Sequence, residues 1–473
     1  MKKRLFINGE WVEAKQYTTL ASPFTGESIA EIPVANDEEI DAAIEAANCA
    51  SEVMAMMPAH KRASILAKLA DLFEQRKEEA ASVIAMEAAK PITTALAEVN
   101  RTILTYRFAA EEAKRIHGET LRLDAAPGGE GRVAYVVREP LGVIGAITPF
   151  NFPMNLVAHK VGPAIASGNT VVLKPASQTP LSAYFLAELL QEAGIPAGAF
   201  NVVTGSGRTV GDKLVTDPRI KMVTFTGSPE VGIGIRNKAG LKRVTLELGS
   251  NAAVIVDEGV NIDKIIPRCV NGAFSFQGQV CISLQRIYVH ETLYDVFVEK
   301  LVAETEKLNI GDPLDPKTDV SALISSADVD RTLNWIEEAK QYGAKVAIGG
   351  KAEGNILHPT VILNAQPHMK VSCQEVFAPI VLINKISSVE EAFGIVNDSR
   401  YGLQAGIYTE NVHTALDAAE KLHVGGVMIN DIPTFRVDNM PYGGVKESGV
   451  GREGIKYAVE EMTEMKLVVF NRN

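Results

Sequence analysis

The stretch FSFQGQVCIS, residues 274–283, places a cysteine directly after two glutamines and a glycine, between apolar residues. Gly278 and Gln279 are typical of a turn with a close backbone approach, and the thiol of Cys281 has the chemistry of a nucleophile that attacks a carbonyl and forms a thioester. The alternative is buried packing, which is common for cysteine. For Cys281 on its own, packing is the favoured interpretation. The four cysteines of the chain form no CxxC pair and no cluster with histidine, so we expect no metal site and no redox dithiol.

Two further residue types suit carbonyl chemistry. Glu247 lies in the apolar run VTLELG, where desolvation raises the pKa of a carboxyl group and makes it a candidate general base. A glutamate in such a run is rarely structural unless it is paired, because burying its charge is costly. Asn151 lies between two prolines in TPFNFP. Its carboxamide could stabilise an oxyanion, although ordering of a turn is the favoured interpretation for this residue alone.

Glycine clusters mark candidate phosphate sites. The GxGxxG match at 449–454 follows a loop instead of a strand, so it lacks the required context and we reject it. The segments TGSGRTVG (204–211) and GSPEVG (227–232) each follow a strand-like run and lead into a helix. Helix N-termini after parallel strands attract phosphate, whereas the alternative is a pair of tight turns. Two such turns at the same end of a sheet favour a nucleotide.

These residues sit in a pattern of alternating strands and helices. Residues 38–117 are expected to be helical because apolar residues recur every three or four positions. From 141 onward, short β-branched runs alternate with helices, and a second alternating set follows Cys281. The pattern predicts an α/β protein with two parallel-sheet domains. Two strand-like segments, 131–140 and 465–473, belong to neither set, and they predict either a small hairpin appendage or an edge strand added to a partner subunit.

The totals limit the function classes. The chain has 473 residues, 46% of them hydrophobic, and a net charge of −11. This is an ordinary globular composition, with enough residues for two or three domains. An acidic chain is a poor non-specific ligand for phosphate backbones, so we do not expect nucleic acid as a partner. We see neither a signal peptide nor a run long enough to cross a membrane, and we therefore expect no membrane association and a cytoplasmic location.

Seven motifs together resemble the aldehyde dehydrogenase superfamily over essentially the whole chain, and most closely its lactaldehyde dehydrogenase-like branch. They are TPFNFP (148–153), LKPAS (173–177), FTGSPEVG (225–232), LELGS (246–250), FSFQGQVC (274–281), EVFAP (375–379) and PYGGVKESGVGRE (441–453). The resemblance implies a Rossmann-like dinucleotide-binding domain (1–120 and 141–244) and a catalytic domain (245–440). It also implies oligomerisation strands (121–140 and 455–473) that extend a partner's sheet in a homodimer or homotetramer.

The resemblance assigns roles to the candidate groups. It implies that Cys281 is the nucleophile, that Asn151 stabilises the oxyanion and that Glu247 is the base that hydrolyses the thioester. Lys160 matches a family lysine near the nicotinamide, with a solvated structural role as the alternative. The expected reaction is NAD(P)-dependent oxidation of an aldehyde to its carboxylic acid. Relatives that transfer the acyl group to coenzyme A typically lack the glutamate that matches Glu247. A catalytically silent structural protein would lack Cys281, Glu247 or Asn151.

Cofactor choice depends on a departure from the family pattern. Lys174 matches the residue that binds the adenosine ribose, and Ser177 stands where strongly NAD-selective members have a glutamate. A carboxylate repels a 2′-phosphate whereas a hydroxyl can donate to it, so we expect NADP to be accepted as well as NAD. Ser228 is expected at the pyrophosphate, and Glu375 and Phe377 at the nicotinamide riboside. The remaining cofactor-binding residues implied by the resemblance are Thr148, Pro149, Phe150, Gly207, Gly211, Gly227 and Leu248.

The substrate end carries two arginines. Arg107 and Arg436 fall near positions that hold anionic groups in relatives, with surface salt bridges as the alternative for each. Phe152 and Val280 stand where phosphate-binding relatives have tyrosine and arginine. We therefore expect a small hydroxylated aldehyde, with or without an anionic end. The alternative substrate is a phosphorylated aldehyde or a dicarboxylic semialdehyde.

Overall fold

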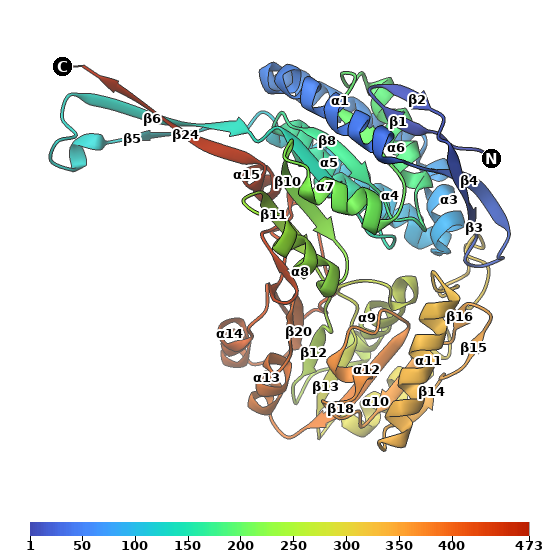
Figure 1. The fold of residues 1–473 in the computed structure, drawn as a ribbon. Coiled ribbons are helices and arrows are strands. Elements are labelled where there is room, and N and C mark those ends of the chain that lie inside the picture. Colours follow the sequence, from blue (N-terminus) through green and yellow to red (C-terminus); the bar gives the residue numbers. More distant parts are fainter. Residues whose placement is uncertain (473) are drawn as a thin grey trace.

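The computed structural model describes residues 1–472, which form two lobes and a projecting arm (Figure 1). The first lobe is built on an eight-stranded sheet in the order β2-β1-β9-β8-β7-β10-β11-β23. Its five central strands, from β9 to β11, are parallel. The strands are β1 (Leu5–Ile7), β2 (Glu10–Val12), β7 (Val143–Ile147), β8 (Thr170–Lys174), β9 (Phe200–Val202), β10 (Ile220–Thr226), β11 (Arg243–Glu247) and β23 (Gly449–Val450).

Helices cover this sheet, and a hairpin of β3 (Gln16–Ala21) and β4 (Ser28–Val34) adjoins it. The helical segments are α1 (Asp37–Met56), α2 (Ala59–Gln75), α3 (Lys77–Ala88), α4 (Ile92–Glu112), α5 (Asn155–Ala166), α6 (Leu181–Ala193), η2 (Gly207–Gly211), α7 (Asp212–Thr216), α8 (Pro229–Lys238) and α15 (Ile455–Glu461). Every residue of α5 is buried, because this helix lies between the sheet strands β7 and β8 and the helices α2 and α4. The predicted helical region 38–117 is thus confirmed as four helices.

The second lobe contains a seven-stranded sheet in the order β14-β17-β18-β13-β12-β20-β21, parallel except for β14. Its strands are β12 (Ala253–Val256), β13 (Arg286–His290), β14 (Lys345–Ile348), β17 (Thr360–Leu363), β18 (Ile380–Ile386), β20 (Gln404–Tyr408) and β21 (Gly426–Ile429). The helices are α9 (Ile262–Phe274), η3 (Ser275–Gly278), α10 (Tyr294–Thr305), α11 (Ser326–Gln341), α12 (Lys370–Cys373), α13 (Val389–Asn397) and α14 (Val412–Lys421). Short strand pairs are formed by β15 (Ala352–Glu353) with β16 (Ile356–Leu357) and by β19 (Tyr401–Gly402) with β22 (Val445–Lys446).

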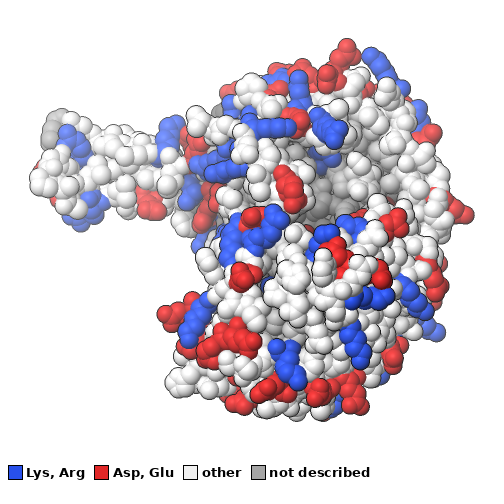
Figure 2. All heavy atoms as spheres, turned by 60° about the horizontal axis from the view of Figure 1, so that its bottom comes forward, with Lys and Arg blue, Asp and Glu red and all other residues white. Residues whose placement is uncertain are grey.

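The arm is a three-stranded antiparallel sheet of β24 (Thr463–Asn471), β6 (Arg132–Pro140) and β5 (Glu119–Leu121), with the short helix η1 (Leu123–Ala125). It projects away from both lobes, and much of the face seen in Figure 2 is uncharged. Large apolar side chains are exposed on β24, among them Leu467 and Phe470, which are 54% and 55% exposed. The two strand-like segments outside the alternating sets are therefore confirmed as partners in one appendage.

Two predicted boundaries need adjustment. Strand β11 continues the first sheet to Glu247, beyond the predicted boundary at 244, because it pairs in parallel with β10 along its whole length. The predicted strand range 455–473 begins with helix α15, whose buried residues Ile455, Ala458 and Val459 recur at helical spacing and pack toward α5. Among the described residues, no helix is both long and apolar enough to span a membrane.

Candidate active site

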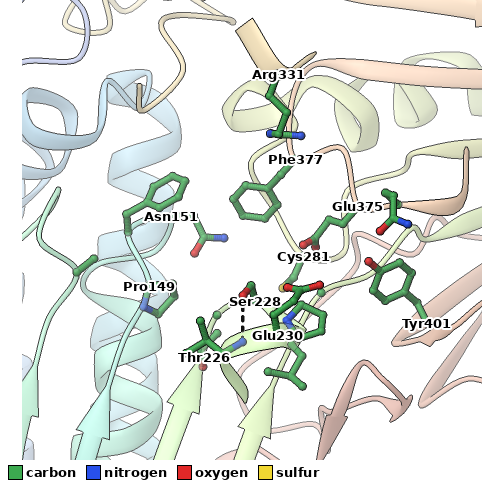
Figure 3. Close-up of a pocket in the computed structure, with 18 of the residues that line it drawn as sticks. Pro149, Asn151, Thr226, Ser228, Glu230, Cys281, Arg331, Glu375, Phe377 and Tyr401 are labelled. Atoms are coloured by element: carbon green, nitrogen blue, oxygen red, sulfur yellow. Dashed lines mark hydrogen bonds between the residues drawn. The ribbon is translucent and has the colours of Figure 1, made fainter. Parts of the chain in front are cut away.

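A cavity of about 740 Å³ lies where the two lobes meet. Figure 2 shows the surface hollowed between the lobes, and Figure 3 shows Asn151 entering the cavity from one side and Cys281, Glu375 and Phe377 from the other. The first lobe contributes segments that follow the carboxyl ends of β7, β10 and β11, as expected for ligand sites of open parallel sheets. The lining residues are Pro149, Phe150, Asn151, Ala176, Gln178, Thr226, Gly227, Ser228, Pro229, Glu230, Val231, Leu248, Gly249, Cys281, Arg331, Trp335, Gln374, Glu375, Phe377 and Tyr401.

The loop before Cys281 has an unusual backbone. Phe276, Gln277 and Gly278 have φ values of 48°, 55° and 68°, a region that non-glycine residues rarely occupy. A Cβ on Gly278 would lie 2.2 Å from the carbonyl oxygen of Ala378, so only glycine fits there. The side chain of Gln277 holds the loop by donating to the carbonyls of Ala89 and Ala322, both at 2.9 Å. The predicted close-approach turn is present, and its strain is fixed by contacts from outside the loop.

The Cys281 thiol is half-buried and lies 3.0 Å from the hydroxyl of Tyr442. Burial raises the pKa of Cys281 to about 11, while the hydrogen bond from Tyr442 and the charge of Arg436 act in the opposite direction. The guanidinium of Arg436 stacks over the Tyr442 ring, 3.6 Å from its centroid. Tyr442 and Arg436 are therefore the groups that favour a thiolate at this position.

Asn151 is 2% exposed and faces the cavity from the loop after β7. Its amide nitrogen donates to the carbonyl of Gln279 at 2.9 Å. This bond joins the Asn151 loop to the nucleophile loop and leaves the second amide hydrogen free. The backbone N–H of Cys281 also has no acceptor among residues 1–472. Two donors are thus available beside the thiol, as an oxyanion site requires.

A buried ion pair fixes this loop from behind. Lys90 and Glu98 are bonded to each other and both side chains are fully buried. The ammonium also donates to the backbone carbonyl of Asn151 at 2.6 Å and lies 3.8 Å and 4.1 Å from the ring centroids of Phe152 and Phe276. Lys90 therefore contacts both the oxyanion loop and the nucleophile loop. The pair is costly to bury, but Glu98 also accepts from the N–H groups of Met154 and Asn155, so both members of the pair are anchored to the backbone of this loop region.

Glu247 ends β11 and is 2% exposed. Both carboxyl oxygens are buried and lack a hydrogen-bond partner within residues 1–472. Burial raises its pKa well above the ordinary value, and the neighbouring charge of Glu453 adds to this. A buried carboxyl group with no partner is unfavourable for folding, and such groups gather at functional sites.

Lys160 occupies a buried network next to Glu247. Its ammonium donates to Thr226 and to Glu453, both at 2.7 Å. Burial opposes ionisation of Glu453, but Lys160 and Arg436 outweigh this effect and hold the pKa of Glu453 below its usual range. Lys160 is 1% exposed, so the solvated alternative is wrong for this residue. Its contact with Thr226, which lines the cavity, places Lys160 next to the cavity wall.

The cavity fits a dinucleotide. Helix α8 begins at its wall, with Ser228 capping the helix and Gly227 before it. A Cβ on Gly227 would lie 2.5 Å from the Phe225 ring, and a Cβ on Gly249 would lie 2.6 Å from the Glu375 carboxylate. Burial raises the pKa of Glu375 to about 7, against the hydrogen bond that it accepts from the Ser250 N–H. A helix N-terminus suits a pyrophosphate, and Glu375 offers an acceptor for ribose hydroxyls.

Of the predicted cofactor residues, Pro149, Phe150, Gly227, Ser228, Leu248, Glu375 and Phe377 line the cavity. Phe150 and Phe377 meet edge to face across the two lobes, with centroids 5.8 Å apart. Thr148 lies just behind, with a buried hydroxyl that has no partner within the described chain.

The other four predicted cofactor-binding residues lie outside the cavity lining, after the ends of β8 and β9 or at the end of β8 itself. They are Lys174, Ser177, Gly207 and Gly211. Ser177 is exposed and donates to the Gly205 carbonyl at 3.4 Å. A Cβ on Gly211 would lie 3.9 Å from the Lys174 side chain, and Gly207 opens the same turn. Burial lowers the pKa of Lys174 to about 8. Ser177 follows Ala176, which lines the cavity, so this group extends the cleft in the direction expected for an adenosine. The rejected glycine run at 449–454 contributes no lining residue.

The predicted substrate arginines differ from each other. Arg107 forms a surface salt bridge, which is the alternative that the sequence left open. Its side chain is 47% exposed and pairs with Asp71 at 3.3 Å, outside the cavity lining. Arg436 is only 6% exposed and pairs with Glu453 at 3.0 Å, so a surface salt bridge is wrong for this residue. Phe152 follows Asn151 and packs edge to face with Phe276.

Sequence reasoning missed Arg101, Asp438 and Tyr442. Arg101 lies on α4, six positions before Arg107, and its guanidinium is 6.0 Å from the Phe152 ring centroid. Two of its nitrogens pair with Asp438, which also bonds to Asn155 and His159. The segment FRVDNMPYGG contains Arg436, Asp438 and Tyr442, and this density of polar residues was the available signal.

Comparison with known proteins identifies the family. A model described as "Aldehyde dehydrogenase family" matches residues 11–468. The chain is 46% identical over 467 residues to the 3-sulfolactaldehyde dehydrogenase of Priestia aryabhattai, covering 99% of this chain and 98% of the relative. It is 41% identical over 471 residues to the lactaldehyde dehydrogenase of Methanococcus aeolicus, covering 99% and 100%. The solved structure of NADP-dependent glyceraldehyde-3-phosphate dehydrogenase from Bacillus halodurans C-125, complexed with NADP, has a TM-score of 0.97 at 38% identity and covers both chains fully.

Proposed function

The chain belongs to the aldehyde dehydrogenase family, and from this premise we propose that it oxidises a small 2-hydroxyaldehyde to the 2-hydroxy acid through a thioester on Cys281. It is an NAD(P)-dependent dehydrogenase. The observation that carries the proposal is the meeting of Cys281 and Asn151 in one cavity, with an unpaired buried carboxyl group, Glu247, nearby.

The first step is attack of the Cys281 sulfur on the aldehyde carbon. The hydroxyl of Tyr442 and the positive charge of Arg436 stabilise the thiolate that attacks. The carbonyl oxygen becomes an alkoxide, and the free hydrogen of the Asn151 amide and the N–H of Cys281 are the donors that stabilise it. Bound NAD(P) supplies the hydride acceptor for the oxidation that gives the thioester.

The second step is hydrolysis, for which Glu247 is the proposed base. Its raised pKa makes it a better proton acceptor than an ordinary carboxylate. A water molecule deprotonated by Glu247 attacks the thioester carbon, the carboxylic acid leaves, and Cys281 returns to its starting state. The presence of Glu247 argues against transfer of the acyl group to coenzyme A.

We propose that NADP is accepted and preferred. Ser177 is exposed, and Lys174 ends β8 three positions earlier, with its ammonium donating to the Pro175 carbonyl, so a hydroxyl and an amine both come from the segment predicted to bind the adenosine. No carboxylate stands at position 177 to repel a 2′-phosphate. The Bacillus halodurans relative was solved with NADP, which is in accord with this choice.

The substrate class follows from the groups beside Cys281. Lactaldehyde, 3-sulfolactaldehyde and glyceraldehyde 3-phosphate, which are named for the relatives, are all 2-hydroxypropanals and differ only at carbon 3. Arg101 has a 28% exposed side chain, and its Nη1 has no partner among residues 1–472. We propose that Arg101, in place of Arg107, receives an anionic group at carbon 3, whereas Arg436 serves the thiol.

A phosphorylated aldehyde is the second candidate substrate, because Arg101 has a nitrogen without a partner among residues 1–472 and its guanidinium lies 6.0 Å from the Phe152 ring centroid. A silent cofactor-binding protein is the candidate of another class. It is disfavoured because Cys281, Glu247 and Asn151 are all present and near one another. We further propose that the arm mediates a homodimer or homotetramer, because its exposed apolar strand β24 offers an unpaired edge.

The test is a panel of lactaldehyde, 3-sulfolactaldehyde, glyceraldehyde 3-phosphate and succinic semialdehyde with each cofactor, followed by absorbance of the reduced cofactor. We expect turnover with the hydroxyaldehydes and none in Cys281→Ser, which should still bind NADP. Cys269→Ser is the matched control, because Cys269 is buried in the core of the second lobe. Activity in Cys281→Ser equal to that of the parent would refute the mechanism.

A further inference from the structure

A second cavity, of about 500 Å³, lies in the second lobe behind the cofactor cleft. It is bounded by β13, by the end of α12 and by the loop from Asn397 to Arg400. Gln374 lines both cavities, so the two sites share a wall. None of the groups assigned to the reaction lies in this second cavity.

Arg286 is the unusual group in its wall. The residue is 5% exposed, and no Asp or Glu of the described chain forms an ion pair with it. Its Nε donates to the Asn251 carbonyl at 2.7 Å and its Nη1 to the Tyr288 hydroxyl at 3.3 Å. Its Nη2 has no partner in residues 1–472. Buried guanidinium groups are normally paired with a carboxylate, so a buried cation with a free donor facing a cavity indicates a ligand.

A second cation lies close by. The Lys446 ammonium donates to the carbonyls of Asn397 and Ser399 at 2.8 Å and 3.0 Å, which leaves one hydrogen free. Burial lowers the pKa of Lys446, and the nearby charge of Arg286 lowers it further, while Asp398 acts in the opposite direction. Both cations line the same cavity, and neither forms an ion pair with an Asp or Glu of the described chain. Lys446 is held there in the left-handed region, at φ 54°.

The balance of charge in the wall is positive. The lining contains Arg286, Arg400 and Lys446 and one carboxylate, that of Asp398. Arg400 is already paired with Glu447 and contacts Gln374. Arg286 and Lys446 are left as the donors for an added negative charge. A phosphate or sulfonate group, with several acceptor oxygens, would satisfy both.

We propose that this cavity is a second binding site, separate from the substrate and cofactor sites, for a small molecule that carries a phosphate or sulfonate group. The ligand's oxygens accept hydrogen bonds from Arg286 Nη2 and Lys446 Nζ.

Titration calorimetry with inorganic phosphate tests this, using the full-length enzyme saturated with NADP so that the cofactor cleft cannot bind the ion. Parallel titrations with sulfate and methanesulfonate compare the affinity for a doubly charged ligand with that for a singly charged one. A titration with chloride at matched ionic strength controls for screening. We expect a phosphate site with a Kd on the order of 1 mM, and this site should be retained in Arg101→Gln, which removes the cation proposed for an anionic substrate. We expect Lys446→Gln and Arg286→Gln each to weaken binding by about tenfold or more, since a charge-assisted hydrogen bond is lost.

Lys446 is at the surface, so its variant should fold even if Arg286→Gln does not. Arg268→Gln is the matched control, because Arg268 lies on the same lobe, pairs with Asp431 at 2.7 Å and faces a different cavity. It should bind phosphate like the parent. The proposal is overturned by absence of phosphate binding to the parent up to 20-fold above that Kd, or by unchanged affinity in a folded Lys446→Gln protein.

Discussion

The contact between Tyr442 and Cys281 makes a quantitative prediction about the reactivity of the nucleophile. Tyr442→Phe keeps the ring on which Arg436 stacks and removes only the hydroxyl that lies 3.0 Å from the thiol sulfur. Because the hydroxyl donates to the thiolate, its loss should raise the pKa of Cys281 above its present value of about 11.

The size of the effect follows from the hydrogen bond. A hydrogen bond to a charged group contributes about 1.5–3 kcal/mol, and a pKa unit corresponds to about 1.36 kcal/mol, so the pKa should rise by roughly one to two units. A more basic thiolate is also a better nucleophile, with a Brønsted coefficient of about 0.4–0.5. The two effects leave a slowing of alkylation of roughly 3- to 16-fold between pH 7 and 10.

The assay is the rate of iodoacetamide alkylation of the Cys281 peptide, followed by mass spectrometry so that Cys49 and Cys373 do not contribute. Tyr408→Phe is the control, because it removes a buried tyrosine hydroxyl in the core of the second lobe that has no partner in the described chain and does not contact Cys281. An unchanged or faster rate in a folded Tyr442→Phe protein would show that the hydroxyl does not stabilise the thiolate.

Four further predictions follow from the site and the arm. Glu247→Gln should release one equivalent of reduced cofactor in a burst and then nearly stop. In the parent, the rate of hydrolysis should rise with pH through the raised pKa of Glu247. An intact steady-state rate in the variant would exclude Glu247 as the base. Lys90→Met should lower stability by about 3–5 kcal/mol, because it leaves Glu98 buried without its partner, and Lys90→Met/Glu98→Gln should recover part of that loss in a thermal melt. Ser177→Glu should reduce kcat/KM with NADP by about tenfold or more while sparing NAD, since a carboxylate repels the 2′-phosphate; an equal loss with both cofactors would contradict the placement of the adenosine. Truncation before Met465 removes most of β24 and should reduce the mass measured by light scattering, and an unchanged mass would rule out the arm as the contact.

Much of the chemistry was accessible from the sequence. The resemblance to aldehyde dehydrogenases is confirmed by the family match and by relatives of the lactaldehyde type, and the expected use of NAD(P) by the family is confirmed as well. The two largely parallel sheets are confirmed. They were predictable because their buried strands contain short apolar, β-branched runs, such as residues 171–173 in β8. These features depend on local patterns, which a single sequence carries.

The substrate end was less accessible, because it depends on contacts between distant residues. Arg101 and Arg107 lie on the same helix, and only the fold shows that Arg101 reaches Asp438 while Arg107 reaches Asp71. The role of Arg436 depends on the stacking against Tyr442 and the ion pair with Glu453. Cys49 is exposed although cysteine is commonly buried.

The site is held by groups that are individually unfavourable. Phe276 and Gln277 are in the left-handed region, Glu247 is buried without a partner in the described chain, and the Lys90–Glu98 pair is buried completely. Each of these costs folding free energy. They are compensated by contacts from the first lobe, because Lys90 and Ala89 hold both loops from one side. The position of Cys281 relative to Asn151 is therefore fixed before any ligand arrives, so ligand binding need not spend free energy on ordering these loops.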